Sequence, residues 1–203
     1  NKKDNKWYQF LVSARSDYSS AGNYKRIIEW VNHQRKLTKF SIKRIDIQSL
    51  DKWKIDNFTS ELKHESGGFF QLQGLRAKTF TTKTEDWDQP IISQNEIGYL
   101  GFITKKINGV LHFLTQAKVE PGNIGGIQLS PTLQATKSNC LRLHRGKKPL
   151  YLEYFQNATK ENIITDNLQS EIGCRFIKKR NRNIIINVKE EISVKDGFKW
   201  MTL

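Results

Sequence analysis

Residues 110–120 carry the side chains of this chain best suited to acid–base chemistry. Between Leu111 and Val119 the odd positions are mostly apolar, and the intervening positions are largely polar. The polar members of the row are His112, Gln116, Lys118 and Glu120. Because side chains alternate along a strand, these four are expected to share one face. A carboxylate and an imidazole can transfer protons, and an ammonium group can stabilise a developing oxyanion. The pattern therefore predicts a strand with a reactive face.

The residues that follow this strand are suited to contact with an uncharged polar ligand. The turn over residues 120–126 holds Asn123 and three glycines, and glycine lets the backbone approach a ligand closely. The next stretch contains a set of neutral polar side chains, namely Gln128, Gln134, Ser138 and Asn139. Such a set suits the hydroxyls of a sugar, or it can simply face water. Ser130 and Pro131 resemble a helix start, which predicts a helix over residues 132–143.

The elements that must position these side chains predict an α+β fold. The apolar spacing of residues 23–35 predicts a helix, and residues 97–105 and 110–120 are expected to form a hairpin around Asn108-Gly109. Further strands are expected at residues 151–155 and 183–188. Long helices do not alternate regularly with strands, so we expect a mixed, largely antiparallel sheet flanked by two or three helices. Residues 1–203 are expected to form a single domain, with residues 1–18 as an N-terminal arm.

Composition limits the class of protein without fixing the function. The formal net charge is +14, but the basic residues are scattered and only residues 178–182 form a basic block. Nucleic-acid binding is therefore kept as an alternative rather than the main hypothesis. Cys140 and Cys174 are expected to be reduced thiols of a cytoplasmic protein. We see no apolar run long enough to span a membrane and no signal peptide. The chain begins without methionine, and we expect terminal residues to be missing.

Several motifs make the chain similar to a known family. They are HESGGFF (64–70), WDQPII (87–92), GYLG (98–101), GVLHFL (109–114), QAKVEPGN (116–123), RLH (142–144), YLEYF (151–155) and RNRN (180–183). Together with the stretch from Glu120 to Asn139, these motifs resemble the nucleotide-diphosphate-hexose 2,3-dehydratases. One position departs from the expected pattern, because Ile172 stands where we expect a glutamine.

The resemblance implies a fold, a reaction and partners. It implies a Nudix-like module, with residues 131–143 at the position of the Nudix helix. That segment has no Asp or Glu, so we do not expect metal-dependent pyrophosphatase activity. The implied reaction is the dehydration of a 4-keto-6-deoxyhexose linked to a nucleoside diphosphate, expected to be dTDP, without metal or cofactor. Family members usually carry two tandem modules, which implies a homodimer here. A separate 3-ketoreductase is expected to act on the product.

The implied reaction needs a base for the proton at C3, donors near the C4 oxygen and an acid for the C2 hydroxyl. Glu120 is the candidate base, and Lys118 is the candidate for stabilising the enolate or holding phosphate. The candidate acids are His144, His112 and Tyr151. Each has a structural alternative: a glutamate can pair with Lys118, a lone histidine in a strand is often buried, and most such tyrosines are packing residues.

Substrate-binding residues are expected for each part of the nucleotide sugar. Guanidinium groups suit the diphosphate, with Arg142 and Arg145, or Arg76 and Lys78, as candidates. Trp87 is a candidate for stacking on the nucleobase, and it can equally be a core residue. The candidates for the sugar are Gln116, Asn123, Gln128, Gln134, Ser138 and Asn139. A catalytically silent module that binds nucleotide sugars is the second hypothesis for the whole chain.

Overall fold

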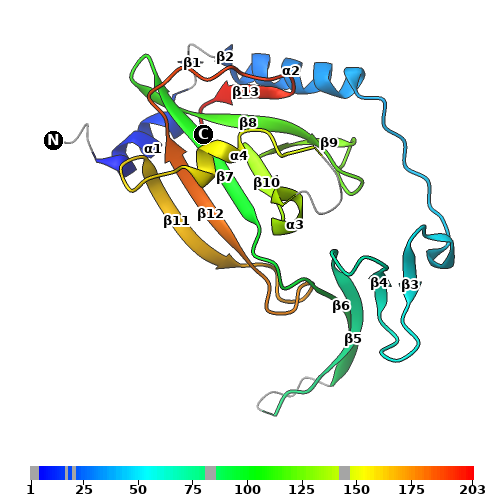
Figure 1. Cartoon of the computed structure of the whole chain (residues 1–203). Coiled ribbons are helices and arrows are strands. Elements are labelled where there is room, and N and C mark those ends of the chain that lie inside the picture. The colour runs from blue at the N-terminus through cyan, green and yellow to red at the C-terminus, as the bar shows by residue number, and fades with distance from the viewer. Residues whose placement is uncertain (1–4, 17, 20–21, 81–85, 142–146) are drawn as a thin grey trace.

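The main sheet is built on the hairpin formed by β7 (Tyr99–Ile107) and β8 (Val110–Val119). The computed structural model describes residues 5–16, 18–19, 22–80, 86–141 and 147–203. The strand order is β11-β12-β7-β8-β13 (Figure 1), with β11 (Ile163–Ser170), β12 (Arg180–Asn187) and β13 (Phe198–Met201). β12 runs parallel to β7, whereas the other neighbours in this order are antiparallel. The predicted mixed, largely antiparallel sheet is confirmed.

The turn between β7 and β8 has the geometry that its sequence predicts. Asn108 has φ 49° and Gly109 has φ 81°, so both central residues lie in the left-handed region. Asn and Gly tolerate this region, and a two-residue turn of this type matches the twist of the flanking strands. The predicted hairpin is therefore confirmed, with Ile107 paired to Val110 across the turn.

β7 and β8 separate beyond the pair Ile103–Leu114 and form a fork (Figure 1). β9 (Ile127–Ser130) pairs with β8, and β10 (Leu133–Ala135) pairs with β7. Thr132 lies between β9 and β10 and is buried. Its hydroxyl accepts a hydrogen bond of 2.9 Å from the amide of Ile103 and donates to the carbonyl of Leu114. One side chain thus satisfies a backbone group of each strand where the ladder ends.

The two faces of the main sheet are covered by different helices. Leu152 and Phe155 of α4 (Leu152–Gln156) are buried against Ile103, Leu114 and Ile184 in the main core. Gly101 permits this contact, because a Cβ there would lie 2.3 Å from the Phe155 ring. Side-chain alternation puts Phe113 on the other face of β8. There it contacts Phe10 of α1 (Lys6–Ala14), with ring centroids 5.7 Å apart.

A second, smaller sheet follows α2 (Tyr24–Leu37) and an extended segment (Figure 1). It is antiparallel and consists of β3 (Trp53–Ile55), β4 (Leu62–His64), β5 (Gln71–Ala77) and β6 (Trp87–Ser93). Its end is tied to the β11–β12 loop, because the Ile92 amide donates to Arg175 O at 2.8 Å and the Ile177 amide donates to Ile92 O at 3.0 Å. A 3₁₀ helix (Ile47–Ser49) and the short pair β1 (Tyr18–Ser19) and β2 (Gly22–Asn23) complete the described elements.

Besides the hairpin, two further sequence-based assignments were right and two were wrong. α2 and β12 agree with the predicted helix at residues 23–35 and strand at residues 183–188. Residues 132–143 do not form one helix, because buried Leu133 and Ala135 alternate as in a strand and only α3 (Lys137–Cys140) is helical. Residues 151–155 are not a strand, since Leu152 and Phe155 are buried with helical spacing.

The structure describes residues 5–16 and 18 of the segment predicted as an N-terminal arm. Residues 6–14 form α1, and Ser13 in this helix is fully buried. The Ser13 hydroxyl donates to Leu111 O at 2.7 Å and accepts from the amide of Leu203 at 3.2 Å. These contacts join α1 to β8 and to the C-terminal residues. No helix in the described part of the chain is long and apolar enough to cross a membrane. The Nudix-like label stays a prediction.

Thr132→Val tests whether the hydroxyl holds the fork. Valine has almost the same shape but leaves the Ile103 amide and the Leu114 carbonyl without this partner. We expect the free energy of unfolding to fall by about 1–3 kcal/mol, the cost of buried groups left unsatisfied. Chemical denaturation would measure it, with the exposed Thr159→Val as the control. Equal stability of the two variants would contradict this role for Thr132.

Candidate active site

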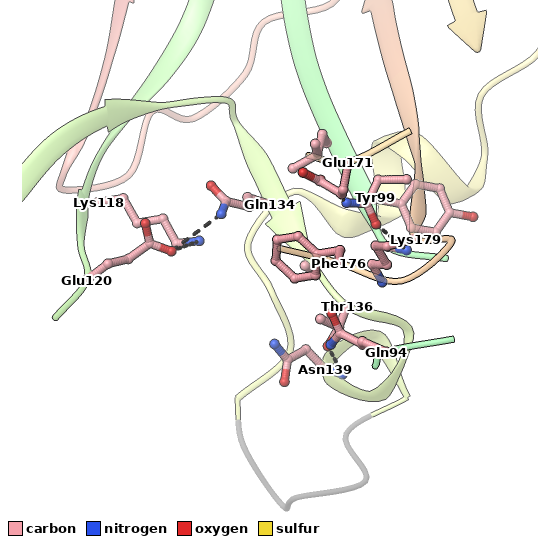
Figure 2. A pocket seen from close by; sticks show the side chains of 14 residues that line it. Gln94, Tyr99, Lys118, Glu120, Gln134, Thr136, Asn139, Glu171, Phe176 and Lys179 are labelled. Carbon is pink, nitrogen blue, oxygen red and sulfur yellow. Dashed lines mark hydrogen bonds and ion pairs between the residues drawn. The ribbon is translucent and has the colours of Figure 1, made fainter. Parts of the chain in front are cut away.

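A cavity of about 390 Å³ lies at the open end of the fork, between the ends of β8 and β10 and the β11–β12 loop (Figure 2). Polar and charged side chains dominate its lining. The lining residues with such side chains are Gln94, Tyr99, Lys118, Glu120, Gln134, Thr136, Asn139, Glu171, Lys179 and Asn181, and Phe176 adds an aromatic ring. The cavity is large enough for a hexose, and its polar groups can hydrogen-bond to such a ligand.

One side of the cavity, the β8 wall, consists of Lys118, Glu120 and Gln134 (Figure 2). The Lys118 ammonium lies 3.0 Å from Glu120 Oε1, and Gln134 Nε2 donates to the same oxygen at 3.4 Å. Asn123 fixes the turn behind them, because its Nδ2 donates to Lys118 O at 3.0 Å. Both charged side chains are partly exposed, 22% for Lys118 and 39% for Glu120. The carboxylate is therefore oriented by two donors and still accessible to a ligand.

The opposite side, the loop wall, contains Tyr99, Glu171 and Lys179 (Figure 2). Asn181 completes it, because this lining residue is hydrogen-bonded to Glu171. Parallel pairing of β12 with β7 places Arg182 opposite Tyr99, which brings this part of the chain to the fork. Asn181 accepts a hydrogen bond of 3.0 Å from the Gly98 amide and donates to Glu171. The β11–β12 loop is thereby held next to the start of β7.

Lys179 is the most buried charged side chain of the cavity, with 6% of its surface exposed. Its Nζ donates to the main-chain oxygen of Glu96. Burial lowers the pKa of Lys179, while the negative charges of Glu96 and Glu171 act in the opposite direction. The loss of solvation is the larger effect because the ammonium group has little contact with water.

Tyr99 is held in place by an ion pair outside the cavity. The Arg182 guanidinium forms two hydrogen bonds with Asp166, from Nε to Oδ1 at 2.8 Å and from Nη2 to Oδ2 at 2.5 Å. The same guanidinium donates to the Tyr99 hydroxyl at 3.3 Å and lies 5.3 Å from the centre of its ring. Hydrogen bonds from Arg182 lower the pKa of Asp166, so the pair stays charged at neutral pH.

Sequence comparison assigns the chain to a family. The family of NDP-hexose 2,3-dehydratases matches residues 24–203. The chain belongs to this family. It is 45% identical over 174 residues to the dTDP-4-dehydro-6-deoxy-alpha-D-glucopyranose 2,3-dehydratase of Saccharopolyspora spinosa, covering 86% of this chain and 36% of the relative. The enzymes of the same name from Amycolatopsis orientalis and Streptomyces violaceoruber are 41% and 40% identical, with 86% and 85% of this chain covered.

The chain spans 36–39% of the length of these curated relatives. The cavity of this family member unites four of the predicted site residues, Lys118, Glu120, Gln134 and Asn139. Ser138 does not line the cavity, and its amide and hydroxyl donate to Glu96 Oε2 at 3.2 and 3.1 Å. Arg142, Arg145 and His144 lie outside the described residues.

The other predicted residues lie away from the cavity. His112 is fully buried, its Nδ1 contacts Val110 O at 2.8 Å, and its Nε2 has no hydrogen-bond partner in the described structure. Tyr151 is also buried, where its hydroxyl donates to Ser193 O at 3.1 Å and accepts from the Lys195 amide at 2.8 Å. Both side chains therefore contribute to the packing of the main sheet. Burial also raises the pKa of Tyr151, which makes it a poorer proton donor.

The remaining candidates belong to other surfaces. Arg76 and Trp87 are on the second sheet, where Arg76 forms two hydrogen bonds of 2.8 Å with Asp88 and Trp87 Nε1 donates to Gln89 Oε1. Gln116 and Gln128 belong to β8 and β9 and do not line the cavity. Asn123 acts through its contact with Lys118 O.

The loop wall was missed because its members are far apart in sequence. Tyr99 and Asn181 lie in the GYLG and RNRN motifs, but only the parallel β7–β12 pairing brings these motifs together. Lys179 was seen as part of a basic block rather than as a buried side chain. The described residues include no group of three or more His, Cys, Asp or Glu that could hold a metal ion. Proton transfer and charge stabilisation are the chemistry that the cavity's own side chains can perform.

His112→Leu tests the structural interpretation of His112. The substitution removes a nitrogen that has no described partner and a local contact with Val110 O. We expect catalytic turnover to be unchanged and the free energy of unfolding to stay within about 1 kcal/mol of the wild type. Steady-state kinetics and denaturation would measure both. A folded variant without activity would show instead that His112 takes part in catalysis.

Proposed function

We propose that the chain catalyses the 2,3-dehydration of a nucleotide-linked 4-keto-6-deoxyhexose. The observation that carries this proposal is the Lys118–Glu120 pair, 3.0 Å apart, at the cavity of a member of this dehydratase family. The C4 ketone acidifies the proton at C3, and Glu120 removes it. The resulting enolate expels the C2 hydroxyl as water, and tautomerisation gives a 3,4-diketo-2,6-dideoxy sugar.

The β8 wall offers the groups that the first step requires. Glu120 is oriented by Lys118 and Gln134 and remains open to the cavity. Lys118 has donors left to approach the C4 oxygen as negative charge develops there, which is the usual role of an oxyanion-stabilising group. No metal or redox cofactor is needed for these steps. The dTDP-linked glucose derivative is the proposed substrate, because it is the one in the names of the relatives.

The proposal includes a cellular setting. The diketo product is reactive, so a separate 3-ketoreductase is expected to consume it. The reaction is also proposed to take place in the cytoplasm. The expectation of a reductase follows from the chemistry of the proposed product.

The direct test is incubation of the chain with dTDP-4-keto-6-deoxyglucose in deuterium oxide. NMR should show exchange of the C3 proton and loss of the C2 hydroxyl, and both should persist with EDTA present. Binding of the nucleotide sugar without exchange would favour the catalytically silent module instead. Binding to DNA or RNA that weakens steeply with salt would favour a nucleic-acid-binding protein.

Glu120→Gln tests the assignment of the base. The amide keeps the shape and a hydrogen bond with Lys118 but cannot accept the C3 proton. We expect the rate of C3 exchange to fall by about 10²–10⁴-fold, the typical contribution of a general base. The matched control is Glu161→Gln, which changes an exposed glutamate and should leave exchange at the wild-type rate. Wild-type exchange in Glu120→Gln would remove Glu120 from the mechanism.

We also propose that the chain forms a homodimer through its second sheet and the preceding segment. Apolar side chains are unusually exposed there, including Phe58 (99%), Ile42 (62%) and Ile55 (53%). Exposed apolar groups of this size commonly mark interfaces. The relatives are more than twice as long as the aligned segment, which leaves room in them for a second module.

Light scattering after size-exclusion chromatography tests the dimer. We expect twice the chain mass of 23.7 kDa for the wild type, and the single mass for Phe58→Asp, because a buried carboxylate opposes association. Leu168→Asp is the control, since Leu168 is half exposed on β11, the edge strand of the main sheet. A monomeric wild type would contradict the proposal.

A further inference from the structure

The loop wall holds a buried cation whose hydrogen-bonding capacity is not used up. Among the described residues, the Lys179 ammonium donates to one acceptor, Glu96 O. An ammonium group carries three N–H donors. Two donors of a side chain that is only 6% exposed therefore lack a described protein partner, and the adjoining space is the cavity. Buried charges without partners are costly, so this arrangement points to an oxygen supplied by a ligand.

The charge of the cavity indicates which part of a nucleotide sugar that oxygen belongs to. The described lining contains two lysines, Lys118 and Lys179, and two glutamates, Glu120 and Glu171, so its formal charge is balanced. Glu171 stands beside Lys179 in the loop wall, and its amide donates to Lys179 O at 3.0 Å. A diphosphate would meet this carboxylate at close range. The uncharged keto-hexose is the better match for this cavity.

The acid–base groups lie on two opposite sides of the cavity that would hold the sugar. Figure 2 shows Lys118 and Glu120 on one side of the cavity, and Glu171 and Lys179 on the other, with Phe176 between them. The β8 wall has the candidate base and a cation for the C4 oxygen. A dehydration also needs a proton for the departing hydroxyl, and the loop wall has the remaining ammonium group.

We propose that Lys179 is the acid that protonates the C2 hydroxyl as it leaves. This assignment rests on the proposed function. Glu120 takes the C3 proton, and the C3–H electron pair forms the enolate. As the C4 carbonyl is restored, the C2–C3 double bond forms and the C2–O bond breaks. The leaving oxygen takes a proton from the Lys179 ammonium and departs as water. Before the next turnover, the neutral amine recovers a proton from solvent and Glu120 releases to solvent the proton that it took from C3.

The surroundings of Lys179 are consistent with this proton transfer. Burial disfavours the charged ammonium, which lowers the pKa of Lys179 and makes it a better acid than an exposed lysine. The negative charges of Glu96 and Glu171 act in the opposite direction on the pKa of Lys179 and favour its protonated form. Asn181 holds Glu171 in place through its side-chain amide, and the Asn181 oxygen is itself fixed by the Gly98 amide.

The experiment compares two leaving groups in the wild type and in Lys179→Met. The hydroxyl of dTDP-4-keto-6-deoxyglucose needs a proton to leave, whereas fluoride from the 2-deoxy-2-fluoro analogue leaves as a stable anion. We expect Lys179→Met to eliminate water about 10²–10⁴-fold more slowly than the wild type. Its C3 exchange and its release of fluoride, followed by proton and fluorine NMR, should match the wild type. A merely misfolded variant would lose all three.

Lys178→Met is the matched control, because it removes a charge from the exposed neighbouring residue. It should eliminate water at the wild-type rate. Lys179→Gln, which keeps a donor for Glu96 O, should share the defect of Lys179→Met.

Two outcomes separate the possible failures. If the wild type neither exchanges the C3 proton nor eliminates water, the proposed function itself is wrong. If the wild type does both and Lys179→Met still eliminates water normally, Glu120 returns the proton it has taken and Lys179 is not the acid. Equal losses with hydroxyl and fluoride substrates in a folded Lys179→Met would likewise overturn the assignment.

Discussion

The fork in the main sheet depends on the buried hydroxyl of Thr132. Where two strands of a ladder separate inside a protein, each loses a hydrogen-bond partner, and water is not present to replace it. Thr132 supplies an acceptor to Ile103 and a donor to Leu114 with one oxygen atom. β9 and β10 can then run along the inner edges of β8 and β7. The cavity lies in the space that this separation opens, so the position of both walls follows from a local backbone requirement.

The cavity differs from the rest of the chain in its electrostatics. The chain carries a net charge of +14, yet the described lining contains two lysines and two glutamates. A balanced set of charges creates no strong net field, and such a lining still offers a carboxylate and a cation. The excess positive charge is carried by residues outside this described lining.

Patterns within a few residues predicted the β8 wall. The loop wall could not be predicted in this way, because it depends on the pairing of strands that are far apart in the sequence. Asn108-Gly109 and the alternation after it were sufficient to predict the hairpin and the Lys118–Glu120 pair. The same alternation misplaced His112, because β8 is buried on both faces near its start and only its far end meets the cavity. Ser130 and Pro131 resembled a helix start, but the fork requires residues 133–135 to pair with β7. Lys179 could be recognised as a cavity residue only once the pairing of β7 with β12 was known.

The second sheet is coupled to the cavity through the loop that carries Lys179. Ile92 at the end of β6 exchanges two backbone hydrogen bonds with the loop, one on each side of Phe176. Phe176 and Gln94, two residues after Ile92, both line the cavity. A displacement of the second sheet must therefore move part of the cavity lining. A subunit that covers the exposed apolar side chains of this sheet would restrain the loop wall as well. Association and catalysis would then depend on the same few backbone contacts, although the interface and the reacting atoms lie on different parts of the molecule.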